Sequence, residues 1–270
     1  MIDKIAALVL AYNEAEMLQH TLPAMKQCVD EIIVVDMGSD DGSFEIYEKF
    51  LTEADRVVSY PRSNLFAFGF AHPRNYGTQF TRANWVLAID SDELVEPEQV
   101  RALRQLDPGA TRAFNVTRKN YQQAPGLGLH DLGQLIKDAP FTTEQHRRFH
   151  WNDPAMRWEG LIHEEIWDGG ASAYATAGQV DVTLHHLNAY KTHGSAHEKQ
   201  LLYSYITLKA VAFPRFQYGT NEYWFTTFVQ QNFSSLVEYA NAFSDAQGLP
   251  RLPMSLLTEA LDKLPATAAS

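Results

Sequence analysis

The chain has 270 residues, of which 45% are hydrophobic and 20% charged, and its formal net charge is −11. This apolar content is enough to bury a core, which excludes a disordered chain, and the length fits one large domain or one domain with an appendage. The acidic excess argues against a nucleic-acid backbone as the main partner. The single cysteine, Cys28, excludes an intrachain disulfide framework. The sequence contains no run of about 18 apolar residues, so we expect no transmembrane helix. We expect a cytoplasmic protein.

The first 110 residues alternate short apolar runs with amphipathic stretches. Four runs rich in Val and Ile predict strands, at residues 6–12, 31–36, 56–60 and 85–90. Apolar residues recur at helical spacing between these runs. Strand and helix in alternation predict an α/β fold with a Rossmann-like, mostly parallel central sheet and helices on both of its faces.

The pattern of predicted secondary structure changes after residue 110. Short β-like pieces separated by Gly and Pro stretches continue to about residue 192, and helical patterns follow at 195–213, 222–246 and 253–264. We expect an α/β domain over residues 1–192, in halves 1–110 and 111–192, and a helical C-terminal segment over 193–270. This segment would form one side of a site or a contact in a homo-oligomer.

Polar residues follow three of the predicted strands. The sequence Tyr12-Asn13-Glu14 ends the first, Asp36 ends the second, and Asp90-Ser91-Asp92 ends the fourth. Open parallel sheets bind ligands at the carboxyl ends of their strands. We therefore expect these residues to form one site.

The segment Asp90-Ser91-Asp92 is the strongest single signal. Alternation in an extended chain puts the two carboxylates on the same side, about 6 to 7 Å apart. Both could then reach a hard divalent cation, and Mg²⁺ usually takes its remaining ligands from substrate phosphates. The alternative is a solvated acidic turn that opens the following helix.

The segment from Asp36 to Ser43 contains two glycines and three aspartates. The Asp36 carboxylate could accept hydrogen bonds from a nucleoside base or ribose, while the glycines let the backbone pass close to the ligand. Alternatively, Asp41 or Ser43 caps the helix that follows. The two interpretations are compatible.

Further motifs are Arg74-Asn75-x-Gly77, Arg147-Arg148-Phe149, Glu159-Gly160-x-x-His163-Glu164 and Leu184-His185-His186. Together with Tyr12-Asn13-Glu14, Asp36-x-Gly38-Ser39-x-Asp41-Gly42-Ser43 and Asp90-Ser91-Asp92-Glu93, they resemble the family 2 glycosyltransferases, which have the GT-A fold and use nucleotide-diphosphate sugars. The resemblance extends from about residue 5 to 208, and it looks like the bacterial branch that includes lipopolysaccharide core glucosyltransferases and peptide-glycosylating enzymes.

The resemblance implies a nucleotide-sugar half at residues 1–110, an acceptor and catalytic half at 111–192, and the following roles. Arg74 would face the pyrophosphate, where a guanidinium can bridge two oxygens. The residues that would bind the nucleotide sugar are Tyr12, Asn13, Glu14, Asp36, Arg74, Asp90, Ser91 and Arg148.

The resemblance also implies a metal site. Asp92 would be the direct ligand, with Asp90 nearby, and Glu93 would orient Asp92. His185 would complete the site, with His186 as the alternative, and a histidine that merely satisfies the core is the competing interpretation for both.

An inverting transferase of this kind needs a base that takes the proton of the acceptor hydroxyl. Glu164 follows a Gly-containing turn and is our choice. His163 could be that base instead, or could orient it.

We therefore expect an inverting glycosyltransferase that depends on Mn²⁺ or Mg²⁺ and moves a hexose, from a UDP sugar, to a hydroxyl of a glycan, a peptide or a modified nucleobase. One alternative is a non-catalytic nucleotide- or carbohydrate-binding module. Another is a sugar-nucleotide nucleotidylyltransferase, but such an enzyme would need a basic, Gly-rich phosphate loop after the first strand, where Tyr12-Asn13-Glu14 stands.

Overall fold

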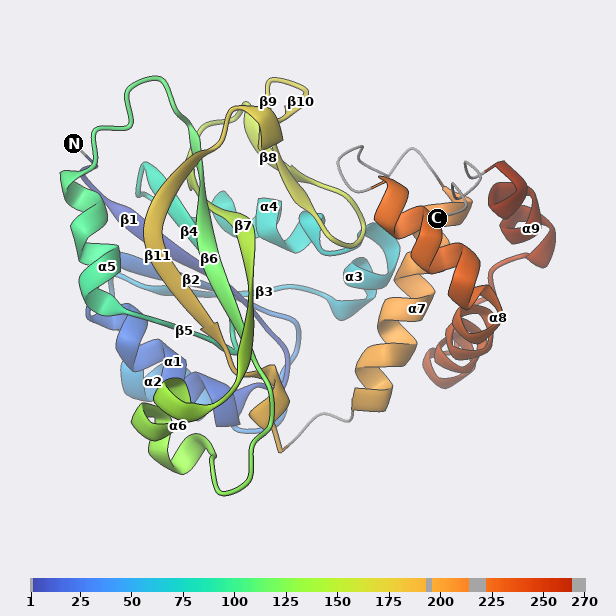
Figure 1. Ribbon diagram of the computed structural model, residues 1–270, viewed down its shortest axis with the longest axis horizontal. Helices are drawn as coiled ribbons and strands as arrows, with labels where there is room; N and C mark the ends of the chain where they lie inside the picture. The colour runs from blue at the N-terminus through green and yellow to red at the C-terminus, as the bar shows by residue number, and fades with distance from the viewer. Residues whose placement is uncertain (1, 193–195, 214–221, 264–270) are drawn as a thin grey trace. The chain divides into compact units, whose positions relative to one another are not determined.

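A computed structural model of the chain describes residues 2–192, 196–213 and 222–263 (Figure 1). Its contacts divide the chain into two compact units, each assembled from three segments. The first, here called the sheet unit, comprises Met1–Arg62, Pro73–Met156 and Ala173–His193. The second, here called the helical unit, comprises Ser63–His72, Arg157–Ser172 and Gly194–Ser270. None of the helices in the described residues is both long enough and apolar enough to cross a bilayer.

An eight-stranded sheet organises the sheet unit, in the order β3-β2-β1-β4-β7-β6-β11-β5. Four of the seven neighbouring pairs are parallel, and the antiparallel ones are β4 with β7, β7 with β6, and β11 with β5. The strands are β1 (Ile5–Ala11), β2 (Glu31–Asp36), β3 (Arg56–Ser59), β4 (Trp85–Asp90), β5 (Glu93–Val95), β6 (Ala113–Tyr121), β7 (Phe141–Trp151) and β11 (Gly178–His186).

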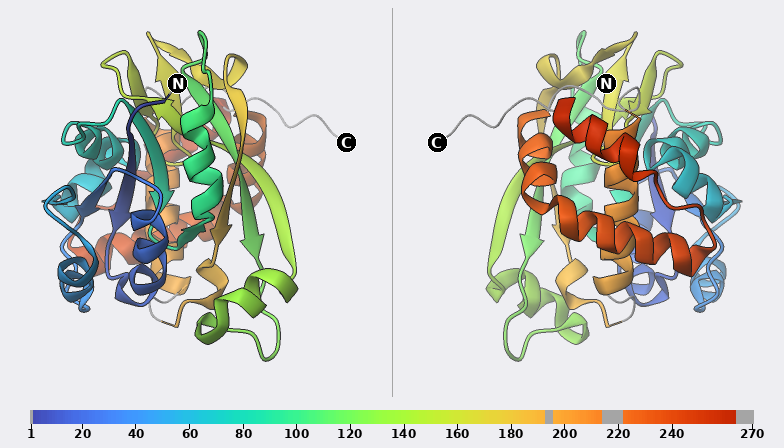
Figure 2. Two further views of the ribbon diagram at one scale, coloured as in Figure 1. Left: turned by 90° about the vertical axis from the view of Figure 1, so that its left-hand side faces the viewer. Right: turned by 90° about the vertical axis from the view of Figure 1, so that its right-hand side faces the viewer.

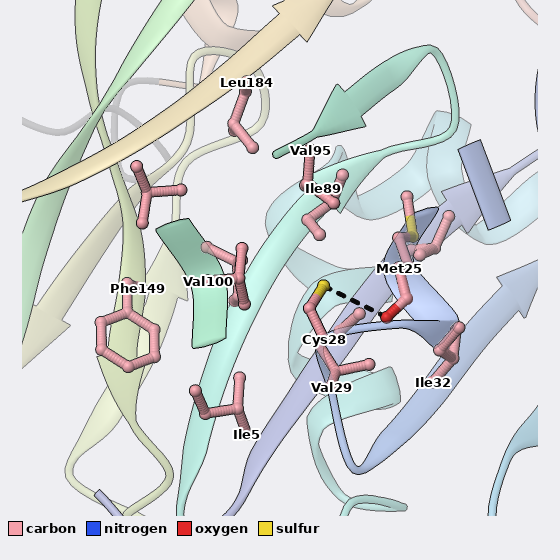
Figure 3. Packing of buried hydrophobic residues seen from close by; sticks show 14 of the residues in the cluster. Ile5, Met25, Cys28, Val29, Ile32, Ile89, Val95, Val100, Phe149 and Leu184 are labelled. Carbon is pink, nitrogen blue, oxygen red and sulfur yellow. Dashed lines mark hydrogen bonds between the residues drawn. The ribbon is translucent and has the colours of Figure 1, made fainter. Parts of the chain in front are cut away.

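Helices cover both faces of this sheet. The unit holds α1 (Ala15–Lys26), α2 (Ser43–Phe50), most of α4 (Ala71–Thr78), α5 (Pro97–Ala102) and α6 (Leu132–Asp138). Alternate residues of β1, from Ile5 to Ala11, pack with Leu22 and Met25 of α1 and with Val100 of α5 in one buried cluster (Figure 3). Figure 2 shows α5 lying along that face.

The opposite face of the sheet receives α4 at a glycine. A Cβ atom on Gly77 would lie 2.5 Å from both Leu8 Cδ1 and Val35 Cγ2, so only glycine lets the helix approach the strands this closely. The strands are therefore covered on both sides. This explains why every residue of β1 and β2 is buried and why their only polar residues are Glu31 and Asp36, the two ends of β2.

The helical unit combines a small sheet with three C-terminal helices. The sheet has the order β10-β9-β8, and α7 packs against both α8 and α9 (Figure 2). Its elements are most of α3 (Arg62–Phe68), most of β8 (Met156–Glu159), β9 (Glu165–Asp168), β10 (Ala171–Ser172), α7 (Ala196–Ala212), α8 (Glu222–Gln247) and α9 (Met254–Lys263). Phe243 of α8 lies edge-on to Phe66, with ring centroids 5.1 Å apart.

The predicted fold class is confirmed: an α/β chain with a mostly parallel sheet, flanking helices and C-terminal helices. Two of the four predicted strands, 31–36 and 85–90, have the observed bounds. The prediction at 6–12 is shifted by one residue at both ends, and the one at 56–60 is one residue too long. The expected boundary at residue 192 stays a prediction. The helical unit includes residues 63–72 and 157–172 in addition to the C-terminal helices.

Candidate functional site

The carboxyl ends of β1, β2 and β4 are neighbours at one edge of the sheet. Ala11 of β1 pairs with Asp36 of β2, and Leu10 pairs with Asp90 of β4, so the two aspartates flank the end of the middle strand. Because the three strands are parallel, the loops that follow them emerge at the same edge.

The Asp36 carboxylate holds its own loop in shape. Its Oδ1 accepts hydrogen bonds from the backbone N–H groups of Gly38 and Ser39, both at 2.9 Å. Its Oδ2 accepts from the Ser39 hydroxyl at 2.7 Å and the Tyr47 hydroxyl at 2.8 Å. Burial, and then the adjacent Asp36 charge, raise the pKa of Tyr47, which keeps it a donor. Asp36, 1% exposed, thus fixes the loop backbone, and its predicted contact with a nucleoside stays a prediction.

The loop after β2 is tied to the loop after β1. Asn13 and Asp40 exchange two hydrogen bonds of 2.8 Å, one from the Asn13 side-chain amide to Asp40 Oδ1 and one from the Asp40 backbone N–H to Asn13 Oδ1. Asp41 accepts from the backbone N–H groups of Ala15 and Ser43, at the N-termini of α1 and α2. The N-cap of α2 is Gly42, so Asp41 accepts the first N–H of this helix from the position before the cap. Asn13 links the two loops.

A cation covers the aromatic ring of Tyr12. The guanidinium carbon of Arg62 lies 3.4 Å from the centroid of this half-buried ring. A guanidinium over a ring face is an attractive arrangement, because the ring face is electron-rich. The end of β1 therefore presents a flat pair of groups of the kind on which planar ligands stack.

Asp90 lies between two arginines that come from different elements. Arg74 of α4 donates to Oδ1 at 2.8 Å, and Arg148 of β7 donates to Oδ1 at 3.2 Å and to Oδ2 at 2.9 Å. Burial by itself would raise the pKa of Asp90, but Arg148 and Arg74 outweigh it and hold that pKa well below its usual range. Asp90 is therefore ionised, and it positions the two guanidiniums at the strand end.

Glu93 supports this cluster from inside the protein. It is fully buried, and its Oε2 accepts the backbone N–H of Asp90 at 2.8 Å. Its Oε1 lies 3.6 Å from Arg118 and 4.0 Å from Arg148. Ser91, also buried, accepts the Thr21 hydroxyl at its carbonyl oxygen. The segment after β4 is thus fixed on both sides.

The Asp92 carboxylate faces an ammonium group. Lys191 Nζ lies 2.8 Å from Asp92 Oδ2 and donates to Glu14 Oε1 at 2.5 Å, so it bridges the loops after β1 and β4. Burial would lower the pKa of Lys191, but Asp92 and Glu14 outweigh it and raise that pKa. Lys191 is therefore positively charged, and its ammonium lies at the strand edge.

The two adjacent histidines at the end of β11 have different partners. His186 Nε2 lies 3.6 Å from Asp92 Oδ2, and His186 Nδ1 is hydrogen-bonded to Asn120 Oδ1 at 2.8 Å. His185 is buried, with Nδ1 2.8 Å from the Tyr121 hydroxyl and Nε2 2.9 Å from Glu96 Oε1. Burial lowers the pKa of His185, against the opposing effect of Glu96. The structure brings His186 to Asp92 and gives both nitrogens of His185 other partners.

These contacts decide how a divalent ion could be held. Within the described residues, no three His, Cys, Asp or Glu side chains form a group suited to a metal. Asp92 Oδ2 and His186 Nε2 lie 3.6 Å apart, and both are atoms of a type that can act as a metal ligand. The carboxamide oxygen of Asn120 must accept from His186 Nδ1, which leaves Nε2 of the neutral ring with its lone pair. Two protein ligands suffice for Mg²⁺ when substrate phosphates supply others.

The predicted base residues belong to the helical unit. His163 and Glu164 lie between β8 and β9, His163 exposed and Glu164 half-buried. The backbone of His163 has a φ of +54°, which a non-glycine residue rarely adopts. Just upstream, Leu161 is held closely: its carbonyl accepts the Phe70 N–H at 2.8 Å, and a Cβ on Gly69 would lie 2.3 Å from its Cα. The turn that carries these residues is therefore fixed at its start.

Sequence reasoning missed two groups of this site, Lys191 and Arg62. Lys191 is 177 positions from its partner Glu14, so no local sequence pattern predicts this ion pair. The sequence shows only that a lysine follows the two histidines of β11 by a few residues. This position indicates a place in the site only when the end of β11 is known to lie near Asp92.

Among known proteins, the chain is similar to Glycosyltransferase GlyG of Streptococcus pneumoniae. The two are 31% identical over 109 residues, which cover 39% of this chain and 35% of that protein. It is also 31% identical over 138 residues to a TPR repeat-containing protein of Synechococcus elongatus, over 51% of this chain and 32% of that protein. The chain thus spans about a third of the length of these curated relatives.

The chain is also similar to solved structures. One is the mannosyltransferase PcManGT from Pyrobaculum calidifontis in complex with GDP-Man and Mn²⁺, with a TM-score of 0.48, 15% identity, and coverage of 96% of this chain and 79% of that chain. Another is S. aureus TarS 1–349 in complex with UDP-GlcNAc, with a TM-score of 0.45 and 14% identity. The match covers 97% of this chain and 80% of that chain.

The family model described as Glycosyl transferase family 2 matches residues 7–151. This match covers more than half of the chain and runs from β1 to the end of β7, so it includes the strand ends at Asp36, Asp90 and Asp92. The chain therefore belongs to glycosyl transferase family 2.

Proposed function

We propose that this chain transfers a hexose from a nucleotide-diphosphate sugar, with UDP as the nucleotide, to a hydroxyl group of an acceptor, with inversion at the anomeric carbon. The observation that carries the proposal is the approach of Asp92 and His186 to 3.6 Å at the carboxyl edge of a parallel sheet. This edge is where such sheets bind nucleotides. Membership of the family gives the reaction class.

The diphosphate would bind among the cations of this edge. Arg74 and Arg148 are held by Asp90, and Lys191 is held by Asp92 and Glu14. Guanidinium groups match phosphate oxygens in pairs, and an ammonium acts as a compact point charge. Because Asp90 fixes the two arginines before the donor arrives, they need little reorganisation when negative charge develops on the leaving diphosphate.

Asp92 and His186 would hold the divalent ion, Mn²⁺ or Mg²⁺. When bound, the ion would supply charge neutralisation for the diphosphate. In this proposal Asp90 acts through the arginines and not as a metal ligand, and His185 supports the fold through Tyr121 and Glu96. Glu93 fixes the Asp90 backbone in the same arrangement.

The nucleoside would lie against the loops after β1 and β2. The Tyr12 ring and the Arg62 guanidinium offer a stacking surface, and the loop fixed by Asp36 and Asn13 offers backbone groups beside it. Asp36 would then act by shaping this loop, since its carboxylate already accepts four hydrogen bonds.

Glu164 would accept the proton of the acceptor hydroxyl as that oxygen attacks the anomeric carbon, and the bond from that carbon to the diphosphate breaks. General-base catalysis needs a basic side chain within hydrogen-bond reach of the hydroxyl. His163 would orient Glu164 or replace it, and the two are separated by a variant experiment described below.

Nucleotide binding and product analysis test the proposal. Calorimetric titration with UDP, GDP and dTDP, each with and without Mn²⁺, is expected to give metal-dependent binding of UDP. Incubation with a UDP-hexose is then expected to release UDP. A nucleotidylyltransferase would release pyrophosphate from a sugar phosphate and a nucleoside triphosphate, and a binding module would bind without releasing product. Absence of binding by every nucleotide would overturn the proposal.

A further inference from the structure

The ammonium of Lys191 occupies the place where a divalent ion would approach Asp92. Its Nζ lies 2.8 Å from Asp92 Oδ2, the same oxygen that faces His186 Nε2 at 3.6 Å. It also donates to Glu14 Oε1 at 2.5 Å. The lysine side chain is 15% exposed and that of Asp92 is 6% exposed, so water screens this contact poorly.

A divalent ion and this ammonium cannot share the oxygen without a large repulsion. Magnesium binds carboxylate oxygens at about 2.1 Å, which would place it within a few ångströms of Nζ. Charges of +2 and +1 at such a distance repel strongly in a site of low dielectric constant. The ion alone brings no new negative charge to compensate, whereas a diphosphate brings several.

The backbone beside Lys191 is held in place. The N–H of Tyr190 donates to the carbonyl of Leu187 at 2.8 Å. On the other side, Thr192 bonds Glu16 twice, from its backbone N–H at 2.8 Å and its hydroxyl at 2.6 Å. The ammonium can therefore leave Asp92 only by rotation of its own side chain, and a flexible four-carbon stem permits this while keeping it within the site.

We propose that Lys191 is a resident cation which occupies the Asp92 site in the absence of donor and moves to the donor diphosphate when donor and metal bind together. This inference rests on the proposed function. Its consequence is that the protein binds the divalent ion weakly by itself and strongly in the presence of the nucleotide diphosphate. Lys191 thus couples the binding of the two ligands.

The test measures Mn²⁺ binding by electron paramagnetic resonance of the free ion, first without nucleotide and then with UDP. The variants are Lys191→Met, which removes the charge, Lys191→Gln, which keeps a polar group, and Lys191→Arg, which keeps the charge. The control is Lys26→Met, because Lys26 also pairs with an aspartate, Asp55, at 2.6 Å. Thermal unfolding of each variant checks that it is folded.

Without nucleotide, we expect Lys191→Met and Lys191→Gln to bind Mn²⁺ about tenfold more tightly than the wild type, a typical size for coupling between two ligands. The tightening of Mn²⁺ binding by UDP should shrink by a similar factor in both. Lys191→Arg and Lys26→Met should behave as the wild type does.

Unchanged or weaker Mn²⁺ binding by both neutral variants would overturn the inference. So would similar tightening in Lys26→Met, since any lost lysine would then have the same effect. Failure of the proposed function has a different signature. It would appear as absence of UDP binding by the wild type, and the nucleotide-free comparison would still decide whether Lys191 excludes the ion.

Discussion

Arg148 holds Asp90 with both of its terminal nitrogens. Nη1 lies 3.2 Å from Oδ1 and Nη2 lies 2.9 Å from Oδ2, so a residue of β7 fixes the carboxylate at the end of β4. The two strands are antiparallel neighbours in the sheet. The pair therefore joins the parallel and the antiparallel halves of the sheet at the candidate site.

Removal of this guanidinium should destabilise the fold. We expect Arg148→Met to lower the free energy of unfolding by about 2 to 3 kcal/mol, because it leaves the Asp90 charge partly uncompensated. This is below the full cost of breaking a buried pair, since the Asp90 side chain is 29% exposed and Arg74 still contacts it. Urea unfolding measures the change.

The matched control is Arg101→Met. Arg101 forms an ion pair with Glu98, but both side chains are largely exposed, at 44% and 78%. Such pairs contribute little, so this variant should lie within about 0.5 kcal/mol of the wild type. Equal losses in the two variants would contradict the role given to Arg148.

His150 should make stability depend on pH between about 4 and 6.5. Burial is the main cause that lowers the pKa of this imidazole to about 4. In the unfolded chain the pKa is about 6.5, so between these values the unfolded state binds more protons and stability falls as the pH falls. The loss over the whole interval is up to about 3 kcal/mol, at about 1.4 kcal/mol for each pKa unit.

His150→Asn tests this pH dependence. Asparagine keeps a side-chain donor for the carbonyl of Trp151, which lies 2.9 Å from Nδ1, but does not titrate. The slope of unfolding free energy against pH, from urea unfolding between pH 4.5 and 6.5, should decrease in this variant. The same change at the exposed His130 should leave the slope as it is. A slope unchanged by His150→Asn would show that other groups cause it.

The two histidines at the end of β11 should separate ligand binding from stability. We expect His186→Ala to weaken Mn²⁺-dependent UDP binding about tenfold or more, since it removes a proposed ligand of the ion. His185→Ala should leave that affinity near the wild-type value and lower the free energy of unfolding by about 1 to 3 kcal/mol. The reason is that it leaves the buried Tyr121 hydroxyl without its imidazole partner. Calorimetry measures the affinity and urea unfolding measures the stability of both variants. If His185→Ala weakened UDP binding and His186→Ala lowered only the stability, His185 would be the ligand.

The strand ends could be predicted from the sequence because local patterns determine them. Buried parallel strands are continuous apolar runs, and the first polar residue after each run marks its carboxyl end, as at Asp36 and Asp90. The sequence could not show that β7 lies between β4 and β6, because antiparallel pairing across the sheet depends on tertiary contacts. For that reason the sequence does not predict the contact of Arg148 with Asp90.

The choice between His185 and His186 illustrates the same limit. Successive residues of a strand point to opposite faces, so only one of the two could face the site. In the register of β11 against β5, His186 pairs with Glu93 and His185 pairs with Leu94, and His186 is the histidine that lies near Asp92. Sequence alone does not fix the register of two strands that lie about 90 residues apart.

The last prediction concerns the base. If Glu164 accepts the proton of the acceptor hydroxyl, Glu164→Gln should reduce kcat about 10² to 10⁴-fold and leave the dissociation constant of the donor unchanged, because glutamine keeps the shape but does not accept the proton. Glu159→Gln is the matched control, since Glu159 lies five residues earlier, at the end of β8, and pairs with Arg157 at 2.5 Å. Transfer is measured as UDP release that depends on acceptor, and donor affinity by calorimetry. His163→Asn distinguishes the alternative, because a neutral imidazole accepts the same proton and has an ordinary pKa nearer neutrality. Near-normal turnover in Glu164→Gln together with an inactive His163→Asn would assign the base to His163, and near-normal turnover in both would place the base outside this turn.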